Sequence, residues 1–213
     1  MTLSNKLTIS RILVTPIFVF TLSIDFPGNY LFALLIFLLA MLTDYLDGVL
    51  ARSRGEVTKL GMFMDPLADK ILVTSAFIIF VFPPLGRLRE IMPDGLIPAW
   101  MAIVIVSREF AITGLRLVAA GQGVAIPAGH WGKHKTISQM LTVTGILVYL
   151  CLFYDSRADA ASYRWIITVL AWITVVMTIF SGGYYLVHNY RYFREQGLPG
   201  ENQEGREEAP DAE

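Results

Sequence analysis

The chain has 213 residues, of which 54% are hydrophobic and 16% charged, and its formal net charge is −1. A mean hydropathy of +0.55 is too high for an ordinary soluble domain and predicts membrane-spanning helices. The near-neutral charge excludes a strong field for nucleic acid, and the single cysteine, Cys151, excludes a disulfide or cysteine metal site within one chain.

Six apolar runs separated by turn signals predict an all-α integral membrane protein with six transmembrane helices. The first run ends at Phe26-Pro27-Gly28-Asn29 without the cleavage pattern of a signal peptide, so we interpret it as a span. The predicted spans are residues 12–24, 30–50, 61–82, 96–119, 135–154 and 164–187. They form a catalytic domain over residues 1–194, and the acidic tail at 195–213 is expected to be disordered.

An even number of spans places both termini on one side of the membrane, and the distribution of basic residues indicates which side. On the opposite side Arg87, Arg89, Arg157 and Arg164 are accompanied by acidic residues. Because cytoplasmic loops carry an excess of lysine and arginine, we expect both termini to face the cytoplasm, which is the N-in/C-in orientation. The basic residues predicted on the terminal side are Lys6, Arg52, Arg54, Lys59, Lys133, Lys135, Arg191 and Arg194.

Four aspartates lie where the second predicted span ends and the third begins. Asp44 and Asp47 are three residues apart, and Asp65 and Asp69 are four apart, so each pair shares one face of a helix. Carboxylates near hydrocarbon are costly and need a compensating charge. Oxygen ligands suit Mg²⁺ or Mn²⁺, and two such ions would serve phosphoryl transfer. The simpler interpretation is that these acids form surface ion pairs with nearby basic residues, which are Arg52, Arg54, Lys59 and Lys70.

Small residues continue the stripe of the first aspartate pair. Gly48 and Ala51 lie four and seven residues after Asp44, so a bulky ligand has room to lie against the helix beside the metal. Arg52 follows, and its planar guanidinium suits phosphate oxygens.

A second group of charges lies in the fourth and fifth predicted spans. Arg108, Glu109 and Arg116 occur well inside an apolar run, where charged residues are functional candidates. Lys133 and Lys135 are near a predicted helix N-terminus, which favours an anion. Together they suit a phosphate pocket. The lysines also fit mere markers of the cytoplasmic side, and Arg108–Glu109 or Glu109–Arg116 also fit a structural ion pair.

The pattern D-x2-D-G-x2-A-R-x8-G-x3-D-x3-D, filled here from Asp44 through Gly61 to Asp69, resembles the signature of the CDP-alcohol phosphotransferases. Looser motifs resemble the bacterial phosphatidylglycerophosphate synthase branch of this family. The likeness covers roughly residues 5–187. These motifs are Asn5-x-Leu7-Thr8-x-x-Arg11, Ser107-Arg108-Glu109 with Gly114 and Arg116, and Gly132-Lys133-x-Lys135-Thr136-x-x-Gln139.

The resemblance implies the reaction and the role of each residue. The phosphatidyl group of CDP-diacylglycerol moves to sn-glycerol 3-phosphate, and CMP is released. Metals are implied on Asp44, Asp47, Asp65 and Asp69, with Asp69 also the general base. Homodimers are usual in the family. The implied CDP-diacylglycerol contacts are Asn5, Thr8, Asp47, Gly48, Ala51, Arg52, Thr58 and Gly61; the acceptor contacts are Arg108, Arg116, Lys133 and Lys135.

Three alternatives remain open at this point. A sister enzyme would use another acceptor, such as inositol phosphate or serine, because the aspartate motif concerns only the CDP half of the reaction. A metal-ion transporter would also use intramembrane carboxylates, although it gains nothing from the phosphate-binding Arg52. A catalytically dead lipid-binding homologue would be expected to break the motif, and no position of the motif is broken.

Overall fold

The chain is described by a computed structural model that covers residues 3–54, 59–85, 88–121, 130–153 and 160–190. Within helices, the side chains of residues 3–8, 45–54, 59–66, 69, 88, 91, 130–133 and 160–163 lie outside the described part. The described residues are all-α, as predicted. The helices are α1 (Leu3–Ser23), α2 (Asn29–Arg54), α3 (Lys59–Ile79), α4 (Leu88–Ile91), α5 (Ala99–Gly121), α6 (His130–Phe153) and α7 (Ala160–His188).

The six long helices correspond one to one with the six predicted spans. The largest difference at a C-terminus is in α2, which continues to Arg54 beyond the predicted end at residue 50. In contrast, α3 ends early, because the N–H groups of Val81 and Phe82 bond to carbonyls three residues back and tighten the chain before two prolines. The short α4 was not predicted, since a single turn has no measurable periodicity.

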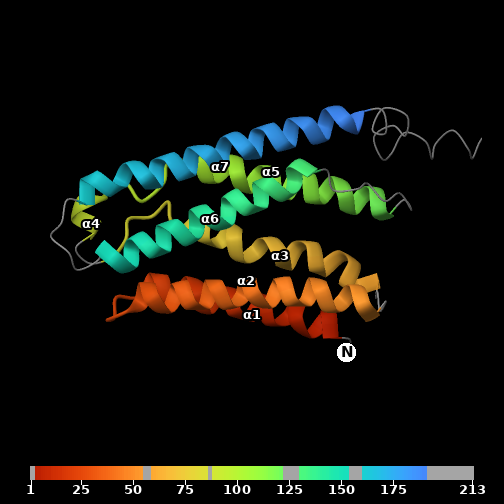
Figure 1. Cartoon of the computed structure of the whole chain (residues 1–213), viewed down its shortest axis with the longest axis horizontal. Helices are drawn as coiled ribbons and strands as arrows, with labels where there is room; N and C mark the ends of the chain where they lie inside the picture. Colours follow the sequence, from red (N-terminus) through yellow and green to blue (C-terminus); the bar gives the residue numbers. More distant parts are fainter. Residues whose placement is uncertain (1–2, 55–58, 86–87, 122–129, 154–159, 191–213) are drawn as a thin grey trace, which may run out of the picture.

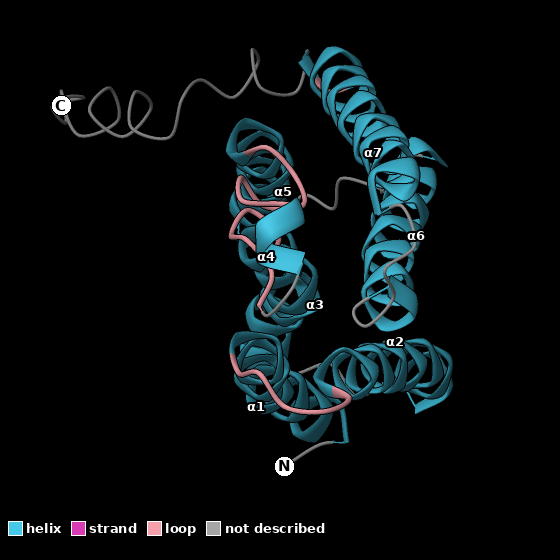
Figure 2. Cartoon of the chain, turned by 90° about the vertical axis from the view of Figure 1, so that its left-hand side faces the viewer, coloured by secondary structure: helices cyan, strands magenta, loops and turns pink. Residues whose placement is uncertain are grey.

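The long helices form a closed ring around a common axis. Helices α1, α3 and α5 make one side, and α2, α6 and α7 make the other (Figure 2). Contacts follow the order α1–α3–α5–α7–α6–α2 and return to α1, with a further contact between α3 and α6. The start of α1, the end of α2, the start of α3 and the end of α7 lie at one end of the bundle (Figure 1). We call this the aspartate end.

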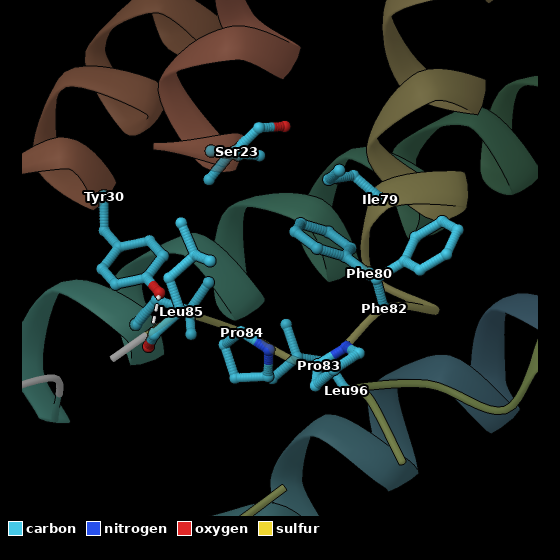
Figure 3. A pocket seen from close by; sticks show the side chains of 11 residues that line it. Ser23, Tyr30, Ile79, Phe80, Phe82, Pro83, Pro84, Leu85 and Leu96 are labelled. Carbon is cyan, nitrogen blue, oxygen red and sulfur yellow. Dashed lines mark hydrogen bonds between the residues drawn. The ribbon is translucent and has the colours of Figure 1, made fainter. Parts of the chain in front are cut away.

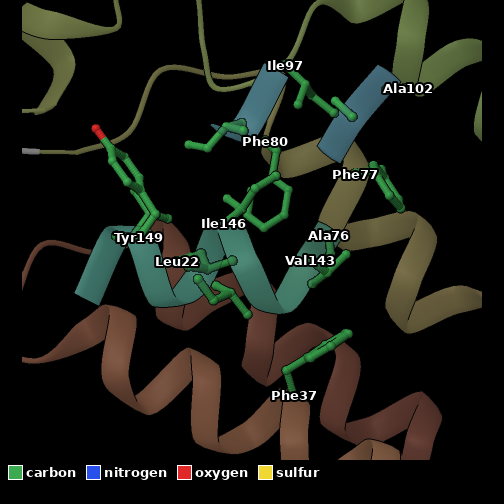
Figure 4. Packing of buried hydrophobic residues seen from close by; sticks show 14 of the residues in the cluster. Leu22, Phe37, Ala76, Phe77, Phe80, Ile97, Ala102, Val143, Ile146 and Tyr149 are labelled. Carbon is green, nitrogen blue, oxygen red and sulfur yellow. The ribbon is translucent and has the colours of Figure 1, made fainter. Parts of the chain in front are cut away.

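The interior of the ring away from the aspartate end is filled by apolar side chains. Phe37 of α2, Phe77 of α3 and Ile146 of α6 are fully buried and belong to one hydrophobic cluster (Figure 4). Phe80 and Ile97 also belong to this cluster (Figure 4). Burying an aromatic side chain removes a large apolar area from solvent, so this cluster is a main source of packing stability.

The loop between α3 and α5 is fastened to the end of α3. The Phe80 carbonyl accepts hydrogen bonds from the N–H groups of Leu96 at 2.9 Å and Ile97 at 3.2 Å. Gly95 has φ of +87°, and a Cβ there would lie 2.1 Å from the Val81 carbonyl oxygen. Only glycine fits this close backbone approach.

The outer surface of the bundle is strongly apolar. Within the described residues, two stretches are long and apolar enough to cross a membrane, His134–Phe153 and Arg164–His188. The described apolar stretches of α1, α2 and α3 are shorter. Helix α5 differs by its three charged residues, Arg108, Glu109 and Arg116. Within the part of the chain that the structure describes, two helices therefore qualify as candidate membrane spans, and the six-span topology stays a prediction.

Candidate active site

A buried carboxylate, Glu109 of α5, lies at the centre of a group of cations. Its side chain is 3% exposed. Lys135 of α6 forms an ion pair with Oε1, Arg108 reaches the same oxygen at 3.2 Å, and Lys70 of α3 lies 3.5 Å from Oε2. The amide of Gln139 donates to Oε1 at 3.1 Å. We call Glu109, Lys70, Arg108 and Lys135 the Glu109 cluster. It connects three helices inside the ring.

Arg108 extends this network to α7. Its Nη2 group donates a hydrogen bond of 2.6 Å to the hydroxyl of Ser181. A Cβ on the next residue, Gly182, would lie 3.2 Å from both Cγ and Nε of Arg108. The absence of a side chain at Gly182 therefore lets the arginine pass close to the α7 backbone. Of the two ion pairs considered from the sequence, the structure contains Arg108–Glu109.

Arg116 lies two helical turns further along α5 and also faces α7. Its guanidinium carbon is 5.2 Å from the centre of the Tyr185 ring, which is the geometry of a cation–π contact. In the described structure, Arg116 Nε and the Tyr185 hydroxyl are buried without a hydrogen-bond partner. Buried donors of this kind usually find partners, so both are available for a polar ligand.

Asp44 is the one predicted metal ligand whose side chain is described. It is 38% exposed, and its Oδ1 forms an ion pair with Arg11 of α1. This arginine belongs to the N-terminal motif that was noted in the sequence. Asp44 is therefore accessible, and an adjacent helix fixes its position.

The backbone places Asp44 of α2 and Asp69 of α3 at the same depth in the bundle. Asp44 is ten residues before the end of α2, and Asp69 is ten residues after the start of α3. Asp47 and Asp65 lie closer to these two ends, which share one end of the bundle where α2 and α3 run in opposite directions (Figure 1). At 1.5 Å per residue, Asp44 and Asp69 both lie about 15 Å from the ends of their helices. The side chains of Asp47, Asp65 and Asp69 are outside the described residues.

Several other predicted contacts also fall outside the described side chains. Among them, Thr58 lies outside the described backbone as well. Within the described part of the chain no three acidic, histidine or cysteine residues gather as a metal site, and that part contains only one of the four aspartate side chains. The other predicted residues without a described side chain are Asn5 and Thr8 on α1, Gly48, Ala51 and Arg52 on α2, Gly61 on α3 and Lys133 on α6.

The structure adds site residues that sequence reasoning missed. Lys70 was considered only as a partner of the aspartates, yet it reaches Glu109 across the ring. Gln139 was noted in a motif without a role. Ser181 and Tyr185 lie at the end of the last span, in a run of small and aromatic residues whose only signal was the weak one of polar groups in an apolar helix.

A cavity at the other end of the bundle has a different character. It has a volume of about 210 Å³ and is lined mainly by apolar residues that include Phe80, Phe82 and Leu96 (Figure 3). Its polar groups are the hydroxyls of Ser23 and Tyr30, and Tyr30 is directed to the Leu85 carbonyl at 3.5 Å. The described lining of this cavity carries no charged side chain, so the Glu109 cluster and the aspartates remain the candidate site.

Comparison with known proteins identifies the family to which the chain belongs. Residues 1–180 match the family model described as CDP-alcohol phosphatidyltransferase. A Bacillus subtilis protein named CDP-diacylglycerol–glycerol-3-phosphate 3-phosphatidyltransferase is 38% identical, over 88% of this chain and 95% of its own length. A Haemophilus influenzae protein of the same name is 32% identical, over 84% of this chain and 89% of its own.

A third relative, from Mycobacterium tuberculosis, is named as a probable phosphatidylglycerophosphate synthase. It is 38% identical over 66% of this chain and 63% of its own length. The family model includes the positions of all four aspartates and of the Glu109 cluster. The resemblance that the sequence motifs indicated is therefore confirmed, and the chain belongs to the CDP-alcohol phosphatidyltransferase family.

Proposed function

We propose that this chain transfers the phosphatidyl group of CDP-diacylglycerol to sn-glycerol 3-phosphate, which releases CMP and forms phosphatidylglycerophosphate. The observation that carries the choice of acceptor is the Glu109 cluster, because three cations around one buried carboxylate suit a phosphorylated alcohol. The relatives named for this reaction cover most of the chain.

The proposed chemistry is an attack by the acceptor hydroxyl on the β-phosphorus of the CDP group. Asp69 takes the hydroxyl proton as general base. The new bond joins the acceptor oxygen to the β-phosphorus, the bond from that phosphorus to the bridging oxygen breaks, and CMP leaves with the electron pair. Lys70 follows Asp69 directly on α3, so the proposed base is on the same helical turn as a residue of the Glu109 cluster.

The four aspartates fit a site for two Mg²⁺ or Mn²⁺ ions. Their donors are all carboxylate oxygens, which hard cations prefer, and the described Asp44 is accessible. When bound, the ions would neutralise charge that develops on the diphosphate. We assign the CMP portion to Gly48, Ala51 and Arg52. Further nucleotide contacts come from Asn5, Thr8, Thr58 and Gly61.

We also propose six membrane spans, with the aspartate end facing the cytoplasm. Large apolar side chains are exposed on every long helix, including Leu13 of α1, Leu39 of α2, Ile78 of α3 and Ile103 of α5. Such a surface is typical of contact with lipid tails. The excess of basic residues at the aspartate end supports the cytoplasmic orientation. The assembly that the family resemblance implies is a homodimer.

The deciding experiment is CMP release by the purified chain in detergent micelles that contain CDP-diacylglycerol and Mg²⁺. Glycerol 3-phosphate, inositol phosphate, inositol and serine are supplied separately. Release with glycerol 3-phosphate alone is expected. Release with a different acceptor would retain the aspartate chemistry and overturn the assignment of the acceptor. No release with any acceptor, from protein of verified helical content, would overturn the enzymatic proposal and favour a transporter or a dead homologue.

A further inference from the structure

Glu109 is among the most buried charged groups of the described structure, and it contacts cations from three helices. Lys70 comes from α3, Arg108 from α5 itself and Lys135 from α6. A carboxylate in such a place is costly unless it is paired and hydrogen-bonded, and here both conditions hold through the cations and Gln139. The reaction proposed above gives Glu109 no role in bond making, so its presence calls for another explanation.

The charges of the Glu109 cluster do not cancel. One carboxylate is shared by three cations, which leaves a formal surplus of two positive charges inside the bundle. A surplus of this size matches a phosphomonoester, whose charge near neutral pH is between −1.5 and −2, as it is for phosphoserine. A neutral alcohol such as inositol or a zwitterion such as serine would leave the surplus uncompensated.

The cations of the Glu109 cluster also retain donors for a ligand. Arg108 Nε is buried without a hydrogen-bond partner in the described structure. A lysine ammonium has three N–H donors, so one contact with Glu109 leaves others for Lys135. Lys70 is 27% exposed, so this edge of the cluster is open to a molecule that enters from outside.

We propose that Glu109 is a positioning residue for the acceptor phosphate. It holds Lys70, Arg108 and Lys135 in one arrangement against their mutual repulsion, so that their free donors converge on the phosphate beside the helix that carries Asp69. This inference rests on the proposed function. It adds that specificity for a phosphorylated acceptor depends on an acidic residue.

The role of charge and the role of position predict opposite results for Glu109→Gln. Removing a negative charge raises the positive potential of the cluster, so an effect of charge alone would lower the KM for glycerol 3-phosphate. Loss of the anchor lets three cations separate, so a positioning role raises this KM. The glutamine has the same shape as the glutamate, which limits the change in packing.

The test compares Glu109→Gln, Glu109→Asp and wild type in the full chain, purified in detergent micelles. Steady-state CMP release gives kcat and the two KM values, one for glycerol 3-phosphate and one for CDP-diacylglycerol. The control is Glu90→Gln, which removes an exposed carboxylate from α4 at the far end. Helical circular dichroism and size-exclusion chromatography establish that each variant is folded.

For Glu109→Gln we expect the KM for glycerol 3-phosphate to rise roughly tenfold or more, with the KM for CDP-diacylglycerol within about twofold of wild type. Glu109→Asp retains the charge with a shorter reach and should recover part of the loss. Glu90→Gln should leave all three constants unchanged.

Three results would overturn the inference: a lower or unchanged KM for glycerol 3-phosphate, an equal rise in both KM values, or failure of both Glu109 variants to fold. The last result would make the carboxylate a requirement for folding and not a positioning residue. If wild type itself releases no CMP with glycerol 3-phosphate, the proposed function has failed. If only the Glu109 variants behave unexpectedly, the proposed function stands and the positioning role is rejected.

Discussion

The two halves of the bundle have different interiors: one contains charged side chains and the other is apolar. From Glu109 toward the aspartate end, a buried carboxylate is shared by three cations, and ion pairs connect α3, α5 and α6. From Phe80 toward α4, the interior is apolar and the backbone is tied by hydrogen bonds to one carbonyl. Buried ion pairs contribute little net stability, whereas apolar packing contributes much. Substitutions in the charged half of the bundle should therefore change the kinetic constants, and those in the apolar half should change stability.

The largest effect is expected at Asp69. Asp69→Asn should lower kcat by about 10²- to 10⁴-fold, because an amide cannot take the acceptor proton. Binding of CDP-diacylglycerol should be largely preserved, and equilibrium binding of the lipid in micelles measures this separately. Asp94→Asn, an exposed position at the opposite end, serves as the control. Near-normal turnover in Asp69→Asn would refute the assignment of the general base.

The apolar half should respond through unfolding. Phe80 is 2% exposed, and Phe80→Ala should lower the free energy of unfolding by about 3–5 kcal/mol because it leaves a cavity in the cluster. Phe82→Ala is the matched control, since Phe82 is 59% exposed and should change stability little. Denaturation followed by circular dichroism measures both. A selective change in the KM for glycerol 3-phosphate in Phe80→Ala would contradict the division between the halves.

A smaller effect, on a Michaelis constant and not on kcat, is expected at Lys135. Lys135→Ala should raise the KM for glycerol 3-phosphate by about tenfold, more than it raises the KM for CDP-diacylglycerol, because a buried cation is lost from the Glu109 cluster. Arg164→Ala removes an exposed cation from the start of the described part of α7 and should change neither constant. An equal effect on both substrates would remove Lys135 from the acceptor pocket.

The smallest effect is expected at Ser181. Ser181→Ala removes one of the two described anchors of Arg108, and its contact with Glu109 remains. The loss of one hydrogen bond should raise the KM for glycerol 3-phosphate by about threefold. Ser23→Ala, which removes a hydroxyl bonded only locally to Val19, provides the comparison. Identical kinetics in the two variants would show that α7 does not tune the cluster.

The sequence predicted the helices well because their apolar runs are long and are interrupted by glycine and proline. The Arg108–Glu109 pair was one of two pairs considered from the sequence, and it forms although adjacent residues point about 100° apart on a helix. The contact from Lys70 to Glu109 could not be predicted from the sequence, because it depends on how α3 is rotated toward α5. The same holds for Ser181, which is 73 positions from Arg108 along the chain.

The predicted acceptor residues illustrate a second limit. Arg108, Arg116 and Lys135 were chosen because they are charged within or beside apolar runs. The structure shows that two of them share a carboxylate and that Arg116 lies over an aromatic ring. Charge within a span identifies a region, whereas the partner of each charge is set by packing between helices.

The Phe80 carbonyl accepts two hydrogen bonds, and this has a mechanical consequence for the whole bundle. Two N–H groups of the α3–α5 connection donate to it, and the Gly95 backbone lies close to Val81. Helices α3 and α5 are therefore held together at that end. Helices clamped at one end separate most at the other. Any separation of α3 from α5 would therefore pivot near Phe80 and be largest at the aspartate end.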